Sequence, residues 1–368
     1  MQIPANSNAR PATPTPSPSP SPFPSLSPSL FSFLFSFLLS SCGSQEGARS
    51  ALPGKVGASG ELVVVASFEA WNGAVGDTLQ SIFGVPTPVL PQYEPVMDLV
   101  HLPTDEFDRF WKPHRNILVV DIADRIDTQE PSVKFYRDRY SSGQIFIEAK
   151  ARNAADLARA LDARRQEMVS LLHAEEVDRF GDLIALDVNE VIARDLSTRH
   201  GVSLTVPRDS RLAKENEEFL WIDRQLTRLK GGENHDVQQG FFVYFEPYVS
   251  DTMFTMASRL EARNRFLKKY VPGPTEGSYM TSELRYVPSY EEVVYDGAFA
   301  SELRGLWKIE NNFMGGPYVS LTVHDADRGR LVTVEGYAYA PYFDKREYLR
   351  EVEAVVRSLV FTSGSMGS

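Results

Sequence analysis

The sequence has a single cysteine, fewer cations than anions and no long hydrophobic run. Cys42 is alone, so an internal disulfide is excluded. Lys and Arg total 38 against 49 Asp and Glu, which argues against a protein that binds nucleic acid through overall basicity. The apolar stretch 30–39 is well short of the ~20 residues that a transmembrane helix needs. Core material is plentiful, since 42% of the residues are hydrophobic, enough for one large domain or two ordinary ones.

The first 42 residues predict a targeting signal. Residues 11–28 form a low-complexity run rich in Pro and Ser, which lacks the hydrophobic mass of a core. The stretch 30–39 has the length of a signal-peptide core, and Leu39-Ser40-Ser41-Cys42 resembles the lipobox of bacterial lipoproteins. That resemblance implies cleavage before Cys42, lipidation of its thiol and a stable anchor of two or three acyl chains. The alternative is an ordinary signal peptide, 1–41, followed by an incidental cysteine.

The segment after the cleavage site indicates where the protein faces. The acidic run that resembles a surface-export tag in some envelope lipoproteins is missing, since only Glu46 is acidic there. We therefore expect an outer-membrane protein that is anchored through Cys42 and faces the periplasm. Residues 42–60, rich in Gly, Ala and Ser, predict a lipidated cysteine and a flexible tether. Residues 362–368 predict a disordered tail.

The remaining chain predicts two lobes, 61–180 and 181–361, with the boundary between residues 178 and 188. Patterns of apolar residues predict strands at 61–67, 96–101, 116–121, 144–148, 202–206, 219–225 and 241–246, and a hairpin of 319–323 with 331–340. They predict helices at 75–83, 107–111, 153–172, 189–200, 252–270 and from Asp344, where Glu347 completes a capping-box spacing. No regular βαβ rhythm is visible. The sequence therefore predicts an α+β fold of two lobes, each a mainly antiparallel or mixed sheet with helices packed on one face.

Several longer runs carry a family resemblance. They are residues 269–274, 277–281, 306–317 and 334–337, together with Trp71-Asn72-Gly73, Gly76-Asp77 and His114-Arg115-Asn116-Ile117. These runs resemble the uncharacterised Bacteroidetes-type lipoprotein family classified as a domain of unknown function (DUF number 4837). The resemblance covers roughly residues 60–361. It implies a location in the cell envelope and no particular activity.

No motif for catalysis or cofactor binding is recognised. The histidines lack the i, i+4 pairing of a helical zinc site, and no Cys pair exists, so neither a metal nor another cofactor is expected. A Gly-x-Ser-x-Gly elbow, a Walker loop and a Gly-x-Gly-x-x-Gly turn are all missing. No catalytic residue is assigned, although a Ser-His-Asp set stays open because its members need not be neighbours in sequence.

Two loops are the candidate binding residues. One contains Asn311, Asn312, Gly315 and Gly316, which combine side-chain amides with glycines able to adopt positive φ. The other contains Pro272, Gly273, Gly277, Ser278 and Tyr279, where outward backbone N–H groups would receive an anion or a peptide. The alternatives are a long hairpin turn for the first loop and a rigid connector after a helix for the second.

These observations favour a cell-envelope lipoprotein of unknown activity, a non-catalytic binding or assembly module that faces the periplasm. Its expected partners are the membrane, through Cys42, and an envelope protein or glycan, but not nucleic acid. Two alternatives from other classes stay open: an envelope hydrolase acting on peptidoglycan, peptide or lipid, and a carrier of an apolar ligand.

Overall fold

The structure, a computed structural model, describes residues 52–123 and 130–362. The predictions on the signal peptide, on the lipidation of Cys42 and, apart from Thr362, on the tail at 362–368 lie outside the described residues. In the described part, no helix has both the length and the hydropathy needed to span a membrane.

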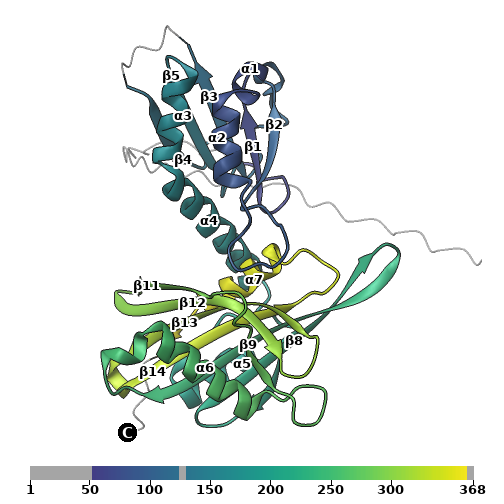
Figure 1. Ribbon diagram of the computed structural model, residues 1–368, viewed down its shortest axis with the longest axis vertical. Helices are drawn as coiled ribbons and strands as arrows, with labels where there is room; N and C mark the ends of the chain where they lie inside the picture. Colours follow the sequence, from purple (N-terminus) through teal and green to yellow (C-terminus); the bar gives the residue numbers. More distant parts are fainter. Residues whose placement is uncertain (1–51, 124–129, 363–368) are drawn as a thin grey trace, which may run out of the picture. The chain divides into compact units, whose positions relative to one another are not determined.

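The N-terminal lobe is built on a five-stranded mixed sheet (Figure 1). Its strand order is β2-β1-β3-β5-β4; the first four of these strands run parallel, and β4 is antiparallel to β5. The strands are β1 (Glu61–Val65), β2 (Asp98–Leu102), β3 (Asn116–Ile122), β4 (Ser132–Arg137) and β5 (Ile145–Ala151). The run of β-branched residues in β1 is buried on both faces, which explains why it shows no alternation of polar and apolar residues.

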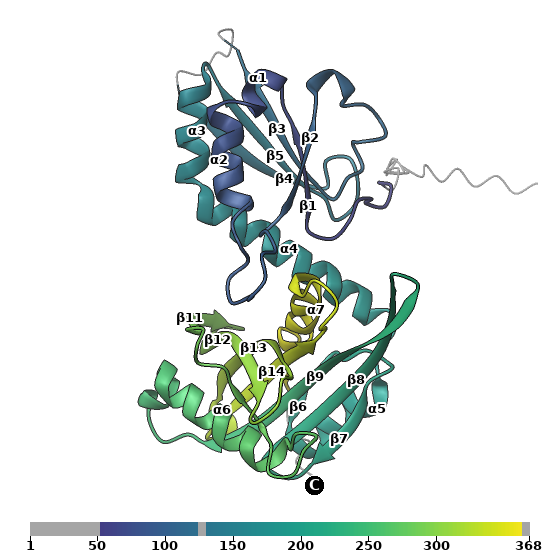
Figure 2. The same ribbon diagram turned by 45° about the vertical axis from the view of Figure 1, so that its right-hand side comes forward.

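Helices cover one face of this sheet, and loops cover the other (Figure 2). The helices are α1 (Phe68–Trp71), α2 (Ala74–Phe83), α3 (Ala154–Ala163) and α4 (Arg165–Ala185). The predicted helix 153–172 is two helices, because Arg164 leaves helical geometry at φ −104° and ψ 10°. The predicted helix 107–111 is wrong: a 3₁₀ turn, η1 (Thr104–Glu106), follows Pro103, and a further turn at residues 109–113 ends at Pro113.

Residues 52–60 do not form the predicted flexible tether. Val56 donates its N–H to Pro113 O at 3.0 Å and accepts from the N–H of Arg115 at 2.9 Å. Ser142 donates to Pro53 O at 2.9 Å, and Gly60 O accepts from Asp98 N at 2.8 Å. These backbone hydrogen bonds attach the segment to the lobe despite its Gly- and Ala-rich composition.

The C-terminal lobe is built on an eight-stranded antiparallel sheet. Its order is β10-β12-β13-β14-β9-β8-β7, and β11 also pairs with β12. The strands are β7 (Arg211–Glu215), β8 (Phe219–Lys230), β9 (Glu233–Pro247), β10 (Met280–Ser282), β11 (Ser289–Tyr295), β12 (Ala298–Ile309), β13 (Gly315–Asp325) and β14 (Arg330–Tyr339); β6 (Val202–Ser203) pairs separately with β15 (Val360–Phe361). The long hairpin of β8 and β9 extends beyond the neighbouring strands (Figure 1).

Side chains of β13 point alternately to the two faces of this sheet, and each face is covered by a separate hydrophobic core. Val319, Leu321 and Val323 face the core that includes α7, whereas Tyr318 faces the core that includes α6. The helical elements are α5 (Glu190–Asp195), a π turn η2 (Leu196–His200), η3 (Asp251–Phe254), α6 (Met256–Tyr270), η4 (Ala326–Arg328) and α7 (Arg346–Val356). The fold is α+β in two lobes, as predicted, and in this lobe helices lie on both faces.

Two predicted helix ends have different outcomes. The predicted helix 189–200 ends as expected, because Gly201 follows it in the left-handed conformation, at φ 68°. The capping box at Asp344 is wrong, because α7 begins after Lys345 with no side-chain cap of its own, and Leu359 lies beyond its last turn. The missing cap comes from the other lobe.

Candidate functional site

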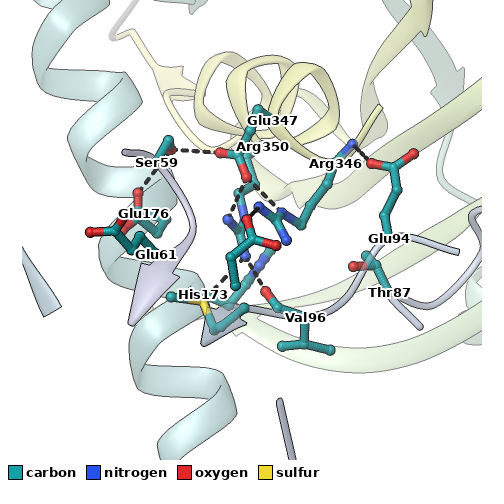
Figure 3. A network of polar contacts seen from close by, with 12 residues as sticks. Ser59, Glu61, Thr87, Glu94, Val96, His173, Glu176, Arg346, Glu347 and Arg350 are labelled. Atoms are coloured by element: carbon teal, nitrogen blue, oxygen red, sulfur yellow. Dashed lines mark hydrogen bonds and ion pairs between the residues drawn. The ribbon is translucent and has the colours of Figure 1, made fainter. Parts of the chain in front are cut away.

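Helix α7 begins against the N-terminal lobe, which supplies its cap. The carboxylate of Glu94 accepts hydrogen bonds from the backbone N–H of Lys345 at 2.8 Å and of Arg346 at 2.6 Å (Figure 3). Glu94 is only 4% exposed. A carboxylate at this end of a helix satisfies free N–H groups and interacts favourably with the helix dipole. Glu94, some 250 positions away in sequence, therefore caps the N-terminus of α7.

Two arginines of α7 extend the same contact. Arg346 pairs with Asp98 at 2.6 Å, and Arg350 donates to the backbone oxygen of Val96 at 2.8 Å. Ser59 donates to Glu347 of α7 at 2.6 Å and to Glu176 of α4 at 3.0 Å (Figure 3). We name these contacts the α7 latch, which comprises Ser59, Glu94, Asp98, Arg346, Glu347 and Arg350.

A second cluster surrounds the carboxylate of Glu176, which is fully buried. It accepts from Asn116 at 2.8 Å and from Arg115 at 3.0 Å, and it pairs with Arg179 one turn further along α4. Burial alone would raise the pKa of Glu176, but Arg179, Asn116 and Arg115 lower it below its ordinary value. Arg115 and Asn116 belong to a run that carries the family resemblance, and the structure assigns them to this cluster.

A third cluster surrounds Glu353 of α7, also fully buried. Its oxygens lie 3.0 Å from His173 Nε2 on α4, 2.6 Å from Arg304 on β12 and 2.8 Å from Arg357. Burial would raise the pKa of Glu353, but Arg304 and His173 hold it well below its ordinary value. This carboxylate thereby joins α4, α7 and the C-terminal sheet.

A fourth pair lies on the other face of the C-terminal sheet. Arg263 of α6 and Glu335 of β14 are both fully buried and form two hydrogen bonds of 2.8 Å each. The guanidinium also lies 3.7 Å from the centre of the Tyr318 ring. Burial would lower the pKa of Arg263, but Glu335 raises it above its ordinary value. The bidentate geometry makes this pair a structural element of the core.

These clusters hold elements together and are poorly suited to acid–base chemistry. A general acid or base must exchange a proton near the working pH and must reach a substrate. Glu176 and Glu353 have lowered pKa values, are enclosed, and are occupied by arginines from neighbouring elements. Within residues 52–123 and 130–362, no three His, Cys, Asp or Glu side chains are grouped as metal ligands.

The structure brings the two predicted loops together, but the Pro-Gly loop is closed on itself. Glu310 donates its N–H to Tyr279 O at 2.9 Å, which places the loops side by side. The hydroxyl of Ser278, a residue only 5% exposed, donates to Thr275 O at 2.6 Å, and Gly273 N–H donates to Ser278 O at 2.8 Å. Gly277 adopts φ +75°. The donors predicted to face a ligand at Gly273 and Ser278 are used within the loop.

In the loop that contains Asn311 and Asn312, the predicted glycine conformations are wrong. Gly315 and Gly316 lie in β13 without positive φ, and a Cβ on Gly316 would approach Ala338 O to 2.0 Å. Asn311 takes the left-handed conformation instead, at φ 61°, and Asn312 Oδ1 accepts from Met314 N–H at 3.1 Å. The close approach of Ala338 in β14 explains why residue 316 is glycine, and both asparagines take part in the turn. Phe313, whose side chain is fully exposed, is the part of this loop that remains available for contact.

An open groove that sequence reasoning missed lies beside the end of α4. It has a volume of about 530 Å³ and we name it the α4 groove. Its lining is Phe180, Leu183, Ile184, Asp187, Pro207, Arg208, Asp209, Arg224 and Glu351. The sequence signal that could have indicated this groove is a group of apolar residues close in sequence, Leu183, Leu186 and Val191. All three are exposed in the structure.

Comparison with protein families agrees with the resemblance. Residues 189–358 match the model of the family described as Domain of unknown function (DUF4837). This match covers 170 of the 368 residues and lies in the C-terminal lobe. Residues 55–184 match a different model, Domain of unknown function (DUF8532), so the match to DUF4837 begins after α4 and not near residue 60. The two matches meet between residues 184 and 189, at the end of the helix that contributes to both cores.

No curated protein matches the sequence. Among solved structures, the chain is similar to a point mutant of the protein Mog1 (TM-score 0.29, 10% identity), with 45% of this chain and 93% of that chain covered. The Ran-binding protein Mog1p of Saccharomyces cerevisiae has a TM-score of 0.28 and 9% identity, with 44% and 91% covered. A protein of Bacteroides thetaiotaomicron has a TM-score of 0.20 and 10% identity, with 46% and 47% covered.

Proposed function

We propose that this protein is a cell-envelope lipoprotein, anchored through Cys42 to the periplasmic face of the outer membrane, whose folded part is a non-catalytic binding or assembly module. The observation that carries the non-catalytic part of this proposal is the surroundings of the buried carboxylates. Glu176 and Glu353 are enclosed and matched by arginines, which lower their pKa values, so they serve as fixed structural charges.

The location rests on the leader. An apolar stretch at 30–39 that ends in Leu39-Ser40-Ser41-Cys42 supports cleavage and lipidation at a solitary cysteine. Two or three acyl chains on one residue give stable membrane attachment, which suits a module that must act at a surface.

The competing class of function, an envelope hydrolase, has no supporting geometry among the described clusters. A carrier of an apolar ligand fits less well too, because more than half of the side chains that line the α4 groove are charged.

The location is tested by mass spectrometry of the full-length protein extracted from membranes with detergent. The expected N-terminal residue is Cys42 carrying fatty acids. Cys42→Ser should move the protein out of the detergent-extracted membrane fraction or leave the leader uncleaved, whereas the matched Ser44→Ala should change neither. A bare thiol at residue 42 on a protein that keeps its leader contradicts the proposal.

A further inference from the structure

The α4 groove has rigid walls. The segment after α4 is joined to residues 206–208 by two backbone hydrogen bonds. Asn189 N–H donates to Val206 O at 3.0 Å, and Arg208 N–H donates to Asp187 O at 2.9 Å. The far wall is fixed by Arg224, which donates to Asp209 and to Glu351 at 2.7 Å each. A site with walls fixed in this way binds without having to order them first.

The end of α4 and the residues that follow it expose apolar side chains, one of which lines the groove. Leu183 is 63% exposed, Leu186, which follows the last residue of α4, is 82% exposed, and Val191 on α5 is 62% exposed. Phe180 and Ile184 continue this surface inward to the core of the C-terminal lobe. Single exposed leucines are ordinary, but three exposed apolar residues within nine positions, one of which lines a groove, favour contact with a partner.

The charges of the groove favour a basic occupant. Three carboxylates, of Asp187, Asp209 and Glu351, line it against two guanidiniums, of Arg208 and Arg224. Both guanidiniums are already paired with these carboxylates. The hydrogen bond that Arg208 donates to Asp187, with the charges of Asp187 and Glu190, raises the pKa of Arg208. After this pairing the lining carries one net negative charge, of the same sign as the net charge of −11 on the whole chain.

We propose that the α4 groove binds a short segment of a partner protein that carries apolar residues flanked by Lys or Arg. The proposal rests on the binding role inferred above and names its surface. Apolar side chains of the partner would cover Leu183 and Leu186, and its cations would meet Asp187 and Asp209 at the rim. Such an arrangement, an apolar centre with a charged border, is how stable protein interfaces exclude water.

The test places a photo-crosslinking residue in the full-length protein in intact cells. Leu186→p-benzoylphenylalanine should trap one protein, and mass spectrometry of the trapped peptide should find apolar residues next to Lys or Arg. The matched control is the same substitution at Leu229, which is 70% exposed on the β8–β9 hairpin. We expect a yield at least tenfold lower there. In the protein that carries the photo-crosslinking residue at position 186, the double substitution Asp187→Lys and Asp209→Lys should reduce the yield of adduct about tenfold.

The other outcomes overturn the proposal. They are an equal yield at Leu229, an adduct with a second copy of this chain or with lipid, a trapped peptide that is acidic, and no adduct in cells that contain the acylated protein. Because the acylation of Cys42 is measured separately, an acylated protein without an adduct rejects the groove and leaves the proposed location intact.

Discussion

Each lobe contains a buried carboxylate that is matched by arginines of the same lobe, but the lobes differ at helix α7. In the C-terminal lobe, Arg263 and Glu335 come from α6 and β14 and complete each other within one core. In the N-terminal lobe, Arg115 and Arg179 match Glu176 in the same way. Buried Glu94 and exposed Asp98 of that lobe instead contact α7, which belongs to the other lobe. The Arg263–Glu335 pair is thus internal to one lobe, whereas the α7 latch joins the two lobes.

Helix α4 adds a second connection of the same kind. Its first half places Met168 and Leu172 in the core of the N-terminal lobe, and its second half places Val177 and Ile184 in the core of the C-terminal lobe. One continuous helix therefore belongs to both cores. We infer that the described part of the chain unfolds as one cooperative unit, although it matches two separate families.

The largest expected effect comes from breaking the pair that is internal to one lobe. Arg263→Ala leaves the carboxylate of Glu335 buried without its partner, which destabilises a protein by about 3–5 kcal/mol. Urea unfolding followed by tryptophan fluorescence measures the loss. The control Arg265→Ala removes an arginine of the same helix whose side chain is 56% exposed, and should change stability by less than about 1 kcal/mol. Equal losses for the two variants would refute the structural role of the buried pair.

A smaller effect is expected at the α7 latch. Glu94→Ala removes the cap of α7, and replacing a helix cap by alanine destabilises by about 1–2 kcal/mol. The same urea experiment applies, with Glu106→Ala as the control because Glu106 is an exposed acid of the same lobe. If both variants are as stable as the native protein, Glu94 is not the cap that the structure assigns.

The smallest effect has the opposite sign and concerns the helix shared by the lobes. Gly181 lies inside α4, and a Cβ there would meet no heavy atom within 4 Å, so Gly181→Ala should stabilise by about 0.5–1 kcal/mol. Gly277 has equally open space but φ +75°, so Gly277→Ala should destabilise. Thermal unfolding of the two variants should shift in opposite directions; shifts in the same direction would contradict this reading of their backbones.

Local sequence patterns predicted those helices and strands whose formation depends on residues that are close together in sequence. The buried run of β1, the end of the predicted helix 189–200 at Gly201 and the alternation in β13 all follow from neighbours in sequence. Strands β8 and β9 are longer than predicted, because charged residues near the hairpin tip hide the pattern. The adjacent Gly231 and Gly232, both at positive φ, were the turn signal that could have revealed it.

The site was harder to predict because its contacts join distant parts of the chain. No local pattern indicates that Glu94 caps α7 or that Arg115 and Asn116 contact Glu176 on α4. Charged residues such as Glu353 read as a solvated helix face, since only the fold shows that arginines enclose them. The candidate loops were chosen for residue types that bind ligands, and the same amides and glycines are what tight turns and close strands require.

Hydrogen exchange measured by mass spectrometry in native protein and in Arg263→Ala tests the coupling of the two lobes most directly. The peptides to compare are β3, in the N-terminal lobe, and β13, in the C-terminal lobe. If the lobes unfold together, the substitution beneath the C-terminal sheet lowers protection in both strands by the same free energy. Lower protection in β13 with unchanged protection in β3 would show two independent lobes and contradict the account.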